Sequence, residues 1–293
     1  MQTLVVVKHS KLEWDCKNSG APRHEMVAHY RKAGANVDTI LASHDYQLRV
    51  RDQVYSQISQ QLMFLDEYER LCKSGLTPKT DLVISVGGDN SFTRVSHFLD
   101  DTPILGVCSD PLRSVGHLCT WKAGHEKSIG ELQQRLGTKN FEVEDWTRIG
   151  VVLDGKSLGE WGINEVFLGE KERTSMSRYL LDDVEVKSSG LVVYTGAGST
   201  GWACSAGAQP FDRKEATLGF IHTEAYTDGM EWTKEAWHTI DSSENLVVKS
   251  LNDNGILSFD GWGRDTEYKF QRGSVAELRT GLPLKVLVFP EGK

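Results

Sequence analysis

The sequence predicts two domains: an N-terminal α/β domain built on a parallel sheet, and a C-terminal domain rich in β-strands. Up to about residue 120, short apolar runs alternate with helix-length segments, which is the pattern of a parallel sheet crossed by helices. After that point short strand-like runs follow one another, with turn residues between them. We therefore expect domains over 1–120 and 121–275, with 275–293 as a segment that can pack back on the first domain.

The composition argues against membrane and nucleic-acid partners. The chain has 293 residues, of which 39% are hydrophobic and 25% charged, and its net charge is −8. An acidic balance disfavours a large nucleic-acid footprint, and no apolar run approaches the ~18 residues that indicate a membrane span. The five scattered cysteines form no C-x-x-C pair, which is typical of a reducing compartment and gives no metal-site spacing. We expect a cytoplasmic protein, or a mature form whose presequence is missing.

The first domain begins with a strand. Leu4–Val7 is a continuous apolar run, and the polar segment Ser10–Pro22 after it predicts a loop. A helix is expected over 22–32, because proline suits a first helical turn and a glycine follows the last one. Val37–Leu41 predicts the second strand. Apolar residues at intervals of three and four then predict a long helix from about Tyr46 to Cys72.

Two glycines and an acidic residue follow the next strand-like run. Leu82–Val86 is short, apolar and rich in β-branched residues, as a buried strand is. The pair Gly87-Gly88 lets the backbone come close to a ligand. Asp89 comes next, at the carboxyl end of a strand, where parallel sheets bind their ligands. A carboxylate there makes sense if it accepts a proton or holds a hydroxyl or a metal; the alternative is an ordinary turn in which it caps a helix.

A helix is expected after Asp89. Asn90 or Ser91 can cap it, and its first N–H groups and its dipole would favour an anion. Pro103–Cys108 then predicts another buried strand, which continues the alternation of strands and helices. The first domain is thus expected to hold a parallel, Rossmann-like sheet covered by helices.

Short strands dominate the second half. One helix is expected over Ala123–Gly137, and the turn pairs Asp154-Gly155 and Asp260-Gly261 separate strand-like runs. The expected strands are Arg148–Leu153, Gly162–Leu168, Tyr179–Lys187, Leu191–Tyr194, Leu246–Ser250, Gly255–Phe259, Tyr268–Arg272 and Leu284–Phe289.

Two stretches of the second half contain polar residues that are candidates for a binding or catalytic site. Asn164 and Glu165 place an amide and a carboxylate on opposite faces of an otherwise apolar strand, so one of them faces a core or a pocket unless the pair is a solvated strand end. In Ser188–Gly207, a strand runs into a glycine- and hydroxyl-rich loop and then into a helix of small residues. Such loops bind phosphates and sugars, although a tight packing corner has the same composition. The loop is neither a P-loop nor a complete G-x-G-x-x-G motif.

Three features stand in a fixed order: G-G-D at 87–89, N-E at 164–165 and T-G-A-G-S-T-G-W at 195–202. Together they resemble the NAD kinase family, and the resemblance extends over most of the chain. It is most similar to the mitochondrial-type branch, because of the segments 109–119, 188–191 and 201–202. The resemblance implies an N-terminal α/β domain, a β-rich C-terminal domain, and an active site in the crevice between them.

The resemblance also implies roles for the matching residues. Asp89 matches the acid that takes the proton of the 2′-hydroxyl of NAD, and because a carboxylate is a weak base for an alcohol, positioning would contribute as much as proton transfer. Glu165 would lie near the ribose hydroxyls and Trp202 would stack on the dinucleotide. The residues that match NAD-binding positions are Asn164, Glu165, Thr200, Trp202 and Ser205; those that match phosphate-binding positions for ATP are Gly87, Gly88 and Asn90.

The implied function is transfer of the γ-phosphate of ATP, or of a phosphate of inorganic polyphosphate, to the 2′-hydroxyl of the adenosine ribose of NAD. Magnesium would be held mainly by the ATP phosphates, so no protein metal ligand is expected. Family members usually assemble as dimers or tetramers, which makes a homodimer or homotetramer the expectation. The mitochondrial matrix is the alternative compartment if a presequence was removed.

The sequence also departs from the family pattern. Asn90 stands where the family usually has the last glycine of G-G-D-G, and Cys108 stands where it commonly has asparagine. Asn90 is tolerable if the position needs φ > 0, but it crowds ATP if the position needs the absence of a side chain. Two alternatives follow: a non-catalytic NAD(P)-binding protein of the same fold, and an NADP 2′-phosphatase. The segment Phe211–Ile240, with Trp232 and Trp237, matches nothing in the family.

Overall fold

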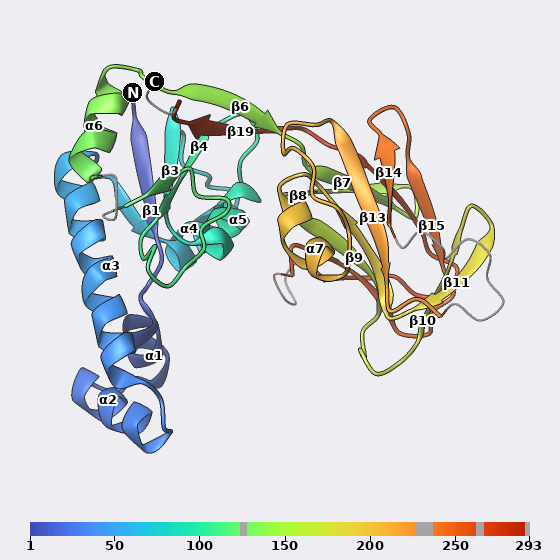
Figure 1. The fold of residues 1–293 in the computed structure, drawn as a ribbon, viewed down its shortest axis with the longest axis horizontal. Helices are drawn as coiled ribbons and strands as arrows, with labels where there is room; N and C mark the ends of the chain where they lie inside the picture. The colour runs from blue at the N-terminus through green and yellow to red at the C-terminus, as the bar shows by residue number, and fades with distance from the viewer. Residues whose placement is uncertain (124–127, 227–236, 262–266, 291–293) are drawn as a thin grey trace. The chain divides into compact units, whose positions relative to one another are not determined.

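The computed structural model describes residues 1–123, 128–226, 237–261 and 267–290. The chain forms two compact units (Figure 1), the first made of Met1–Glu144 with Lys285–Lys293 and the second of Asp145–Leu284. Residues 121–144, which the sequence analysis assigned to the second domain, belong to the first unit. The reason is that they contribute two strands and a helix to its sheet and its core.

The first unit is built on a seven-stranded sheet with the order β2–β1–β3–β4–β19–β6, in which β5 also pairs with β4. Its strands are β1 (Thr3–Val7), β2 (Leu62–Phe64), β3 (Leu82–Gly87), β4 (Ile104–Cys108), β5 (Trp121–Lys122), β6 (Glu142–Trp146) and β19 (Leu284–Val288). Strand β1 runs parallel to β2 and β3, and β4 runs parallel to β3, β5 and β19. The predicted parallel sheet is confirmed.

Helices cover both faces of this sheet (Figure 1). They are α1 (Lys11–Ser19), α2 (Arg23–Lys32), α3 (Val37–Gln57), α4 (Leu65–Lys73), α5 (Asp89–Ser96) and α6 (Ile129–Gly137). Helices α3 and α6 pack on one face, where Val50 and Val54 join Val5 and Val7 in a buried core. Helices α4 and α5 lie on the other face, and α1 and α2 pack at the N-terminal end of α3. None of the helices in the described part of the chain is long and apolar enough to span a bilayer.

Three expected elements of the first unit were wrong. The segment expected as a loop over Ser10–Pro22 contains α1, which is stabilised by a capping box between Ser10 and Glu13. The strand expected over Val37–Leu41 is the beginning of α3, whose N-cap is Asn36. The single helix expected over 46–72 is interrupted by the three-residue strand β2. Helix α6 begins at Ile129, and residues 124–127 of the expected helix lie outside the described residues.

The second unit consists of two six-stranded sheets, as predicted for a β-rich domain. One has the order β11–β10–β15–β18–β7–β8 and the other the order β14–β13–β12–β9–β16–β17. The strands are β7 (Ile149–Leu153), β8 (Lys156–Gly162), β9 (Glu165–Glu170), β10 (Ser177–Leu181), β11 (Val184–Ser188), β12 (Gly190–Tyr194), β13 (Thr217–Thr223), β14 (Trp237–Asp241), β15 (Leu246–Ser250), β16 (Gly255–Phe259), β17 (Glu267–Lys269) and β18 (Val275–Thr280). Their neighbours pair antiparallel, and side chains of both sheets share one apolar core.

Turns explain where the expected strands of this unit differ from the observed ones. The single strand expected over Tyr179–Lys187 is the hairpin β10–β11, which reverses at Asp182 and Asp183 with φ of 48° and 63°. The strand expected over Gly162–Leu168 is broken, because Ile163 and Asn164 lie in a bend between β8 and β9. The unmatched segment Phe211–Ile240 contains β13 and the start of β14; Trp232 lies outside the described residues.

Candidate active site

The carboxylate of Asp89 is held by the backbone of the loop after β4. Asp89 is the first residue of α5, and the N-cap of that helix is Gly88. Its Oδ1 accepts the N–H of Leu118 at 2.7 Å, and its Oδ2 accepts the N–H of His117 at 3.0 Å. Both donors lie outside α5, so the carboxylate does not act as a cap of its own helix. The side chain is fixed at the carboxyl end of β3, next to a helix N-terminus that favours its charge.

The loop that holds Asp89 is itself anchored. The N–H of Ser109 donates to the carbonyl of Gly87 at 2.8 Å. The buried carboxylate of Asp110 accepts the hydroxyl of Ser43 at 2.5 Å and the guanidinium of Arg113 at 2.9 Å. Asp110 therefore ties the loop to α3, so that the two N–H donors of Asp89 have a defined position.

The side chain of Cys108 packs against the same loop. Its side chain is fully buried, and its Sγ lies 3.1 Å from where a Cβ on Gly116 would sit. Gly116 has a φ of +63°, which favours glycine, and burial raises the pKa of the Cys108 thiol. The departure at Cys108 is thus accommodated in the packing of the loop.

The two glycines before Asp89 lie too close to neighbouring side chains to leave room for a Cβ. A Cβ on Gly87 would overlap the side chain of Ser91, and one on Gly88 would lie 2.8 Å from the hydroxyl of Ser114. The predicted caps Asn90 and Ser91 were wrong, since both lie inside α5. Asn90 has a helical backbone with negative φ, and its side chain is exposed. This position therefore does not require the positive φ that glycine favours.

Lys8 is a candidate residue that the sequence analysis missed. It follows β1 directly and lies beside Gly87, where an added Cβ would be 3.3 Å from the Cδ of Lys8. The lysine is half-buried, and within the described residues its ammonium has no hydrogen-bond or ion-pair partner. The signal that could have found it is a cation at the carboxyl end of a strand in a parallel sheet.

In the second unit, a single carboxylate positions the N-E pair. Oδ1 of Asp260 accepts the N–H groups of Asn164 at 2.7 Å and Glu165 at 3.0 Å, and Oδ2 accepts the N–H of Ile163 at 3.0 Å. The N–H of Asp260 donates back to the carbonyl of Glu165 at 2.8 Å. Asp260 has a φ of 52° in the predicted Asp260-Gly261 turn, where aspartate is tolerated. The turn was predicted from the sequence, but the role of Asp260 in positioning the N-E pair was not.

The environment of Glu165 favours the protonated form of its carboxyl group. Burial, followed by the nearby charge of Asp260, raises the pKa of Glu165 to about 8. Glu165 begins β9 and is half-buried. A carboxyl group that is largely protonated near neutral pH can both donate and accept a hydrogen bond, which is what recognition of a ribose hydroxyl requires.

The glycine-rich loop packs against the N-E pair. The hydroxyl of Thr195 donates to the carbonyl of Ile163 at 2.5 Å, and the N–H of Thr195 donates to the carbonyl of Asn164 at 3.0 Å. A Cβ on Gly198 would overlap the backbone of Asn164. The two predicted stretches are therefore brought together in the structure, and Gly198 serves close packing of the loop on the pair.

Three further predicted residues follow on η1 (Gly198–Thr200) and α7 (Trp202–Ser205). Thr200 and Ser205 are exposed, and the hydroxyl of Ser205 donates to the carbonyl of Gly201 at 3.3 Å. Trp202 is half-buried and stacks on Phe167 with ring centroids 5.6 Å apart, and the guanidinium of Arg173 lies 4.9 Å from the Trp202 ring. Part of the indole surface is thus already used in packing.

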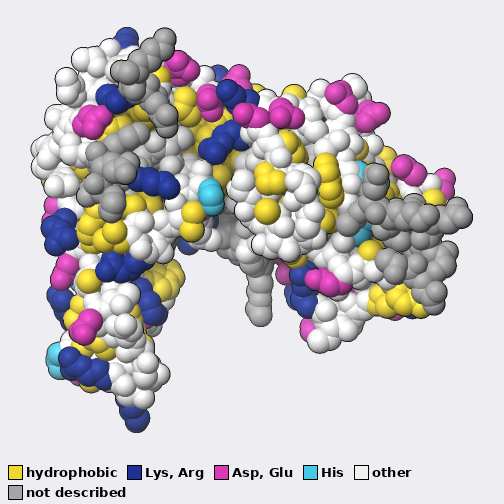
Figure 2. Space-filling view, viewed as in Figure 1, with side chains coloured by type: hydrophobic (Ala, Val, Ile, Leu, Met, Phe, Trp, Pro, Cys, Tyr) yellow, Lys and Arg dark blue, Asp and Glu magenta, His cyan; other side chains and the backbone are white. Residues whose placement is uncertain are grey.

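The described residues hold no group of three or more histidine, cysteine, aspartate or glutamate side chains that could bind a metal ion. On the face shown in Figure 2, Lys and Arg side chains lie mainly over the first unit, and Asp and Glu side chains are prominent along the upper edge of the second unit. A search against protein-family models found no match.

Comparison with known proteins found NAD kinases and NADH kinases among the relatives of this chain. A probable NADH kinase of Oryza sativa is 29% identical over 238 residues, which are 72% of this chain and 71% of that protein. An NAD kinase of Corynebacterium diphtheriae is 31% identical over 155 residues, which are 49% of this chain and 47% of that protein. The chain is a relative of the NAD and NADH kinases. The resemblance read from the sequence is confirmed, and the match to the plant NADH kinase supports the branch.

Solved structures of these kinases share the fold. An NAD kinase from Archaeoglobus fulgidus, solved in complex with ATP, has a TM-score of 0.64 at 18% identity and covers 98% of this chain and 93% of that one. The yeast NADH kinase, solved in complex with NADH, has a TM-score of 0.66 at 13% identity and covers 99% of this chain and 84% of that one. An α/β unit followed by a β-rich unit is thus the fold of NAD kinases as well as of this chain.

Proposed function

We propose that this chain is an NAD kinase-like phosphotransferase that makes NADP from NAD and ATP. The observation that carries the proposal is the fixed carboxylate of Asp89, which two backbone N–H groups hold beside the G-G turn in a relative of the NAD and NADH kinases. The names of the similar proteins support NAD or NADH as the acceptor, and the Archaeoglobus fulgidus complex supports ATP as the donor.

In this proposal the first unit supplies the proton acceptor and the phosphate contacts. The 2′-hydroxyl oxygen attacks the γ-phosphorus, the bond from that phosphorus to the β–γ bridging oxygen breaks, and ADP leaves. Asp89 orients the hydroxyl and accepts its proton, while the backbone at Gly87 and Gly88 lies close to the phosphates. Magnesium enters with ATP as part of the substrate and shields the phosphate charge.

The second unit binds the acceptor. Asn164 and the protonated carboxyl of Glu165 would bind the adenosine part of NAD, with Glu165 at the ribose hydroxyls. Thr200 would contact adenine, and the exposed Ser205 would lie near the nicotinamide end. Trp202 would offer to the dinucleotide the ring surface that Phe167 and Arg173 leave uncovered.

Two broader properties belong to the same proposal. We place the protein in the cytoplasm or the mitochondrial matrix, because all five cysteines are free thiols and four of them are at least half-buried. We also expect a homodimer or homotetramer, as the resemblance to the NAD kinases implies.

The test is NADP formation from NAD, ATP and magnesium, measured with an NADP-specific dehydrogenase, with NADH and inorganic polyphosphate run as second acceptor and donor. The proposal predicts NADP or NADPH that depends on both acceptor and donor. Tight NAD binding without product from any donor would favour the non-catalytic protein. Loss of NADP without ATP would favour the phosphatase.

A further inference from the structure

Strand β9 presents alternate side chains to the two sides of its sheet. Val166 and Leu168 join the apolar core that the two sheets share. Phe167 belongs to a different apolar cluster, on the other side of the sheet, and Trp202 packs against that cluster. Glu165 is two residues before Phe167 in the same strand, so it lies on the same side as Phe167 and Trp202. Two residues proposed to bind the acceptor, Glu165 and Trp202, therefore share one face of this sheet.

The guanidinium of Arg173 covers the aromatic part of this face. Its central carbon lies 4.6 Å from the centroid of the Phe167 ring and 4.9 Å from that of the Trp202 ring. The two rings are close to parallel, with an interplanar angle of 22°. Arg173 is exposed, whereas Phe167 is buried. The guanidinium therefore lies beside any planar group that stacks on the uncovered part of Trp202.

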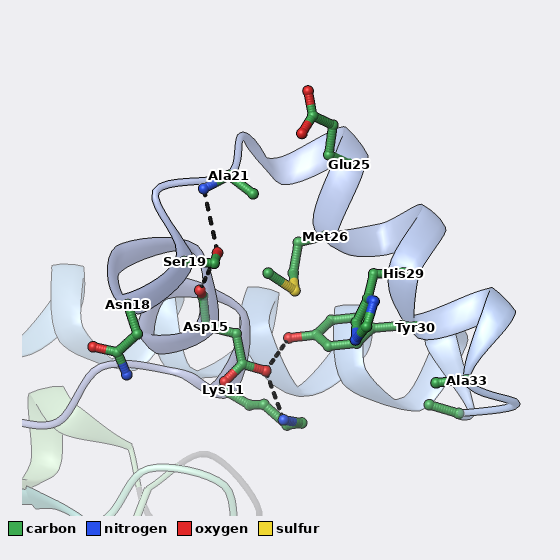
Figure 3. Close-up of a pocket in the computed structure, with 11 residues that line it drawn as sticks. Lys11, Asp15, Asn18, Ser19, Ala21, Glu25, Met26, His29, Tyr30 and Ala33 are labelled. Carbon is green, nitrogen blue, oxygen red and sulfur yellow. Dashed lines mark hydrogen bonds and ion pairs between the residues drawn. The ribbon is translucent and has the colours of Figure 1, made fainter.

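The charge of Arg173 is not neutralised by an ion pair. Among the residues that the structure describes, no acidic side chain pairs with it. Lys11, by contrast, donates to Asp15 at 2.6 Å beside the cavity between α1 and α2 (Figure 3). Glu165, on the same face as the two rings, adds little negative charge near neutral pH, because its pKa is raised to about 8. The carboxylate of Asp260 accepts three backbone N–H groups instead.

The two redox forms of the acceptor differ in charge at one ring. The nicotinamide ring of NAD carries a positive charge and that of NADH is neutral, while the phosphates and the adenosine are the same. In the proposed function Trp202 stacks on the dinucleotide, and Ser205, at the end of the same helical turn, lies near its nicotinamide end. A guanidinium over Trp202 then faces the nicotinamide, where it repels the charged ring and tolerates the neutral one.

We propose that Arg173 determines the acceptor preference of this chain and favours NADH over NAD. The inference rests on the proposed function and deepens it, because it names the redox form of the acceptor that the same site selects. A like charge in this position should make NAD bind more weakly than NADH by roughly three- to tenfold. A guanidinium that contacted the pyrophosphate instead would strengthen the binding of both forms equally, because they carry the same phosphates.

Equilibrium binding of NAD and of NADH tests this proposal without requiring turnover. Arg173→Met removes the charge but keeps a long, flexible apolar side chain over the rings, whereas Arg173→Lys keeps the charge. Arg173→Met should lower the Kd for NAD by roughly three- to tenfold and change the Kd for NADH less than about twofold. With Arg173→Lys the preference for NADH should remain.

Three controls separate charge from packing. Lys249→Met, at an exposed position of β15, removes one positive charge elsewhere in the second unit and should leave both Kd values unchanged. An ionic strength of about 1 M, at which the Debye length is ~3 Å, should reduce the preference of the wild type. The melting temperature of each variant establishes that the fold is intact.

The outcomes distinguish the acceptor preference from the kinase assignment. An Arg173→Met protein with the wild-type ratio of the two Kd values would overturn the preference, and so would equal weakening of NAD and NADH, which indicates a phosphate contact. If the ratio depends on Arg173 but no NADP or NADPH forms, the preference stands and the kinase assignment fails. If product forms and the ratio does not depend on Arg173, only the kinase assignment stands. Binding of neither dinucleotide by the wild type would overturn both.

Discussion

The carboxylate of Asp260 accepts the backbone N–H of Asn164 at 2.7 Å, across 96 positions of sequence. The same side chain also accepts the N–H groups of Ile163 and Glu165. One turn residue thus determines where the proposed NAD-binding pair lies, although it has no assigned contact with a ligand. Asp260 is a positioning residue in this account.

Replacement of Asp260 by asparagine should weaken NAD binding. Asparagine keeps the size of the side chain and tolerates the φ of 52°, but its amide nitrogen faces N–H donors and leaves at least one of them without an acceptor. We expect a loss of about 1–3 kcal/mol in the free energy of unfolding and a several-fold higher Kd for NAD. Calorimetry and NAD titration measure the two effects.

The chain offers a matched control for this variant. Asp154 also lies in an Asp-Gly turn with a φ of 50°, and its carboxylate accepts the N–H of Val275 at 2.8 Å. Asp154→Asn keeps an oxygen for this single N–H, so it should change the stability little and leave the Kd for NAD unchanged. Equal NAD affinities for Asp260→Asn and Asp154→Asn would contradict the positioning role.

Gly198→Ala should displace the N-E pair directly. A Cβ at this position overlaps the backbone of Asn164, which has to move to make room. We expect destabilisation of about 1–3 kcal/mol together with weaker NAD binding. Gly137→Ala is the control, because nothing lies within 4 Å of the added Cβ and the residue ends a helix. A Gly198→Ala protein with wild-type NAD affinity would show that the loop does not fix the pair.

The stability of the protein should depend on pH through Glu165. Its folded-state pKa of about 8 is above the ordinary value of 4.5, so the folded protein keeps a proton that the unfolded chain has lost. The contribution of Glu165 to the free energy of unfolding is therefore fully present below pH 4.5 and is lost as the pH rises to about 8. Glu165→Gln removes it, so the melting temperature of the variant relative to wild type should increase between pH 5 and pH 9.

An exposed carboxyl group provides the comparison for that experiment. Glu142 lies on β6 with an exposed side chain, and Glu142→Gln should shift melting temperatures equally at all these pH values. If the curve of Glu165→Gln also runs parallel to that of the wild type, the carboxyl group is not protonated in the folded protein near neutral pH.

Sequence patterns located those parts of the site whose signals are local. Leu82–Val86 is an apolar β-branched run that ends in glycines, and the strand, the turn and Asp89 follow as predicted. The N-E pair and the glycine-rich loop were recognised in the same way. The sequence did not predict that the pair and the loop are in contact. Gly198 lies against Asn164 only because β9 and β12 pair in the folded protein.

The errors have physical causes of two kinds. Helix α1 was expected as a loop because its exposed face is polar, although Ser10 and Glu13 carry the capping-box signal. Strand β2 has only three residues and falls within the periodicity of the flanking helices, so no local pattern separates it. Lys8 and Asp260 were missed for another reason: their roles depend on neighbours that are far away in sequence.

The central claim is that Asp89 orients and deprotonates the 2′-hydroxyl of NAD, and the most direct measurement compares Asp89→Asn with wild type. Both the rate of NADP formation at saturating ATP and the Kd for NAD are needed. We expect a rate lower by ~10²–10⁴-fold, as for the loss of a general base, with a Kd for NAD close to that of the wild type. The free energy of unfolding should fall by about 1–3 kcal/mol, because the asparagine amide leaves one of the two N–H donors without an acceptor. An Asp89→Asn protein that forms NADP at the wild-type rate would contradict the account.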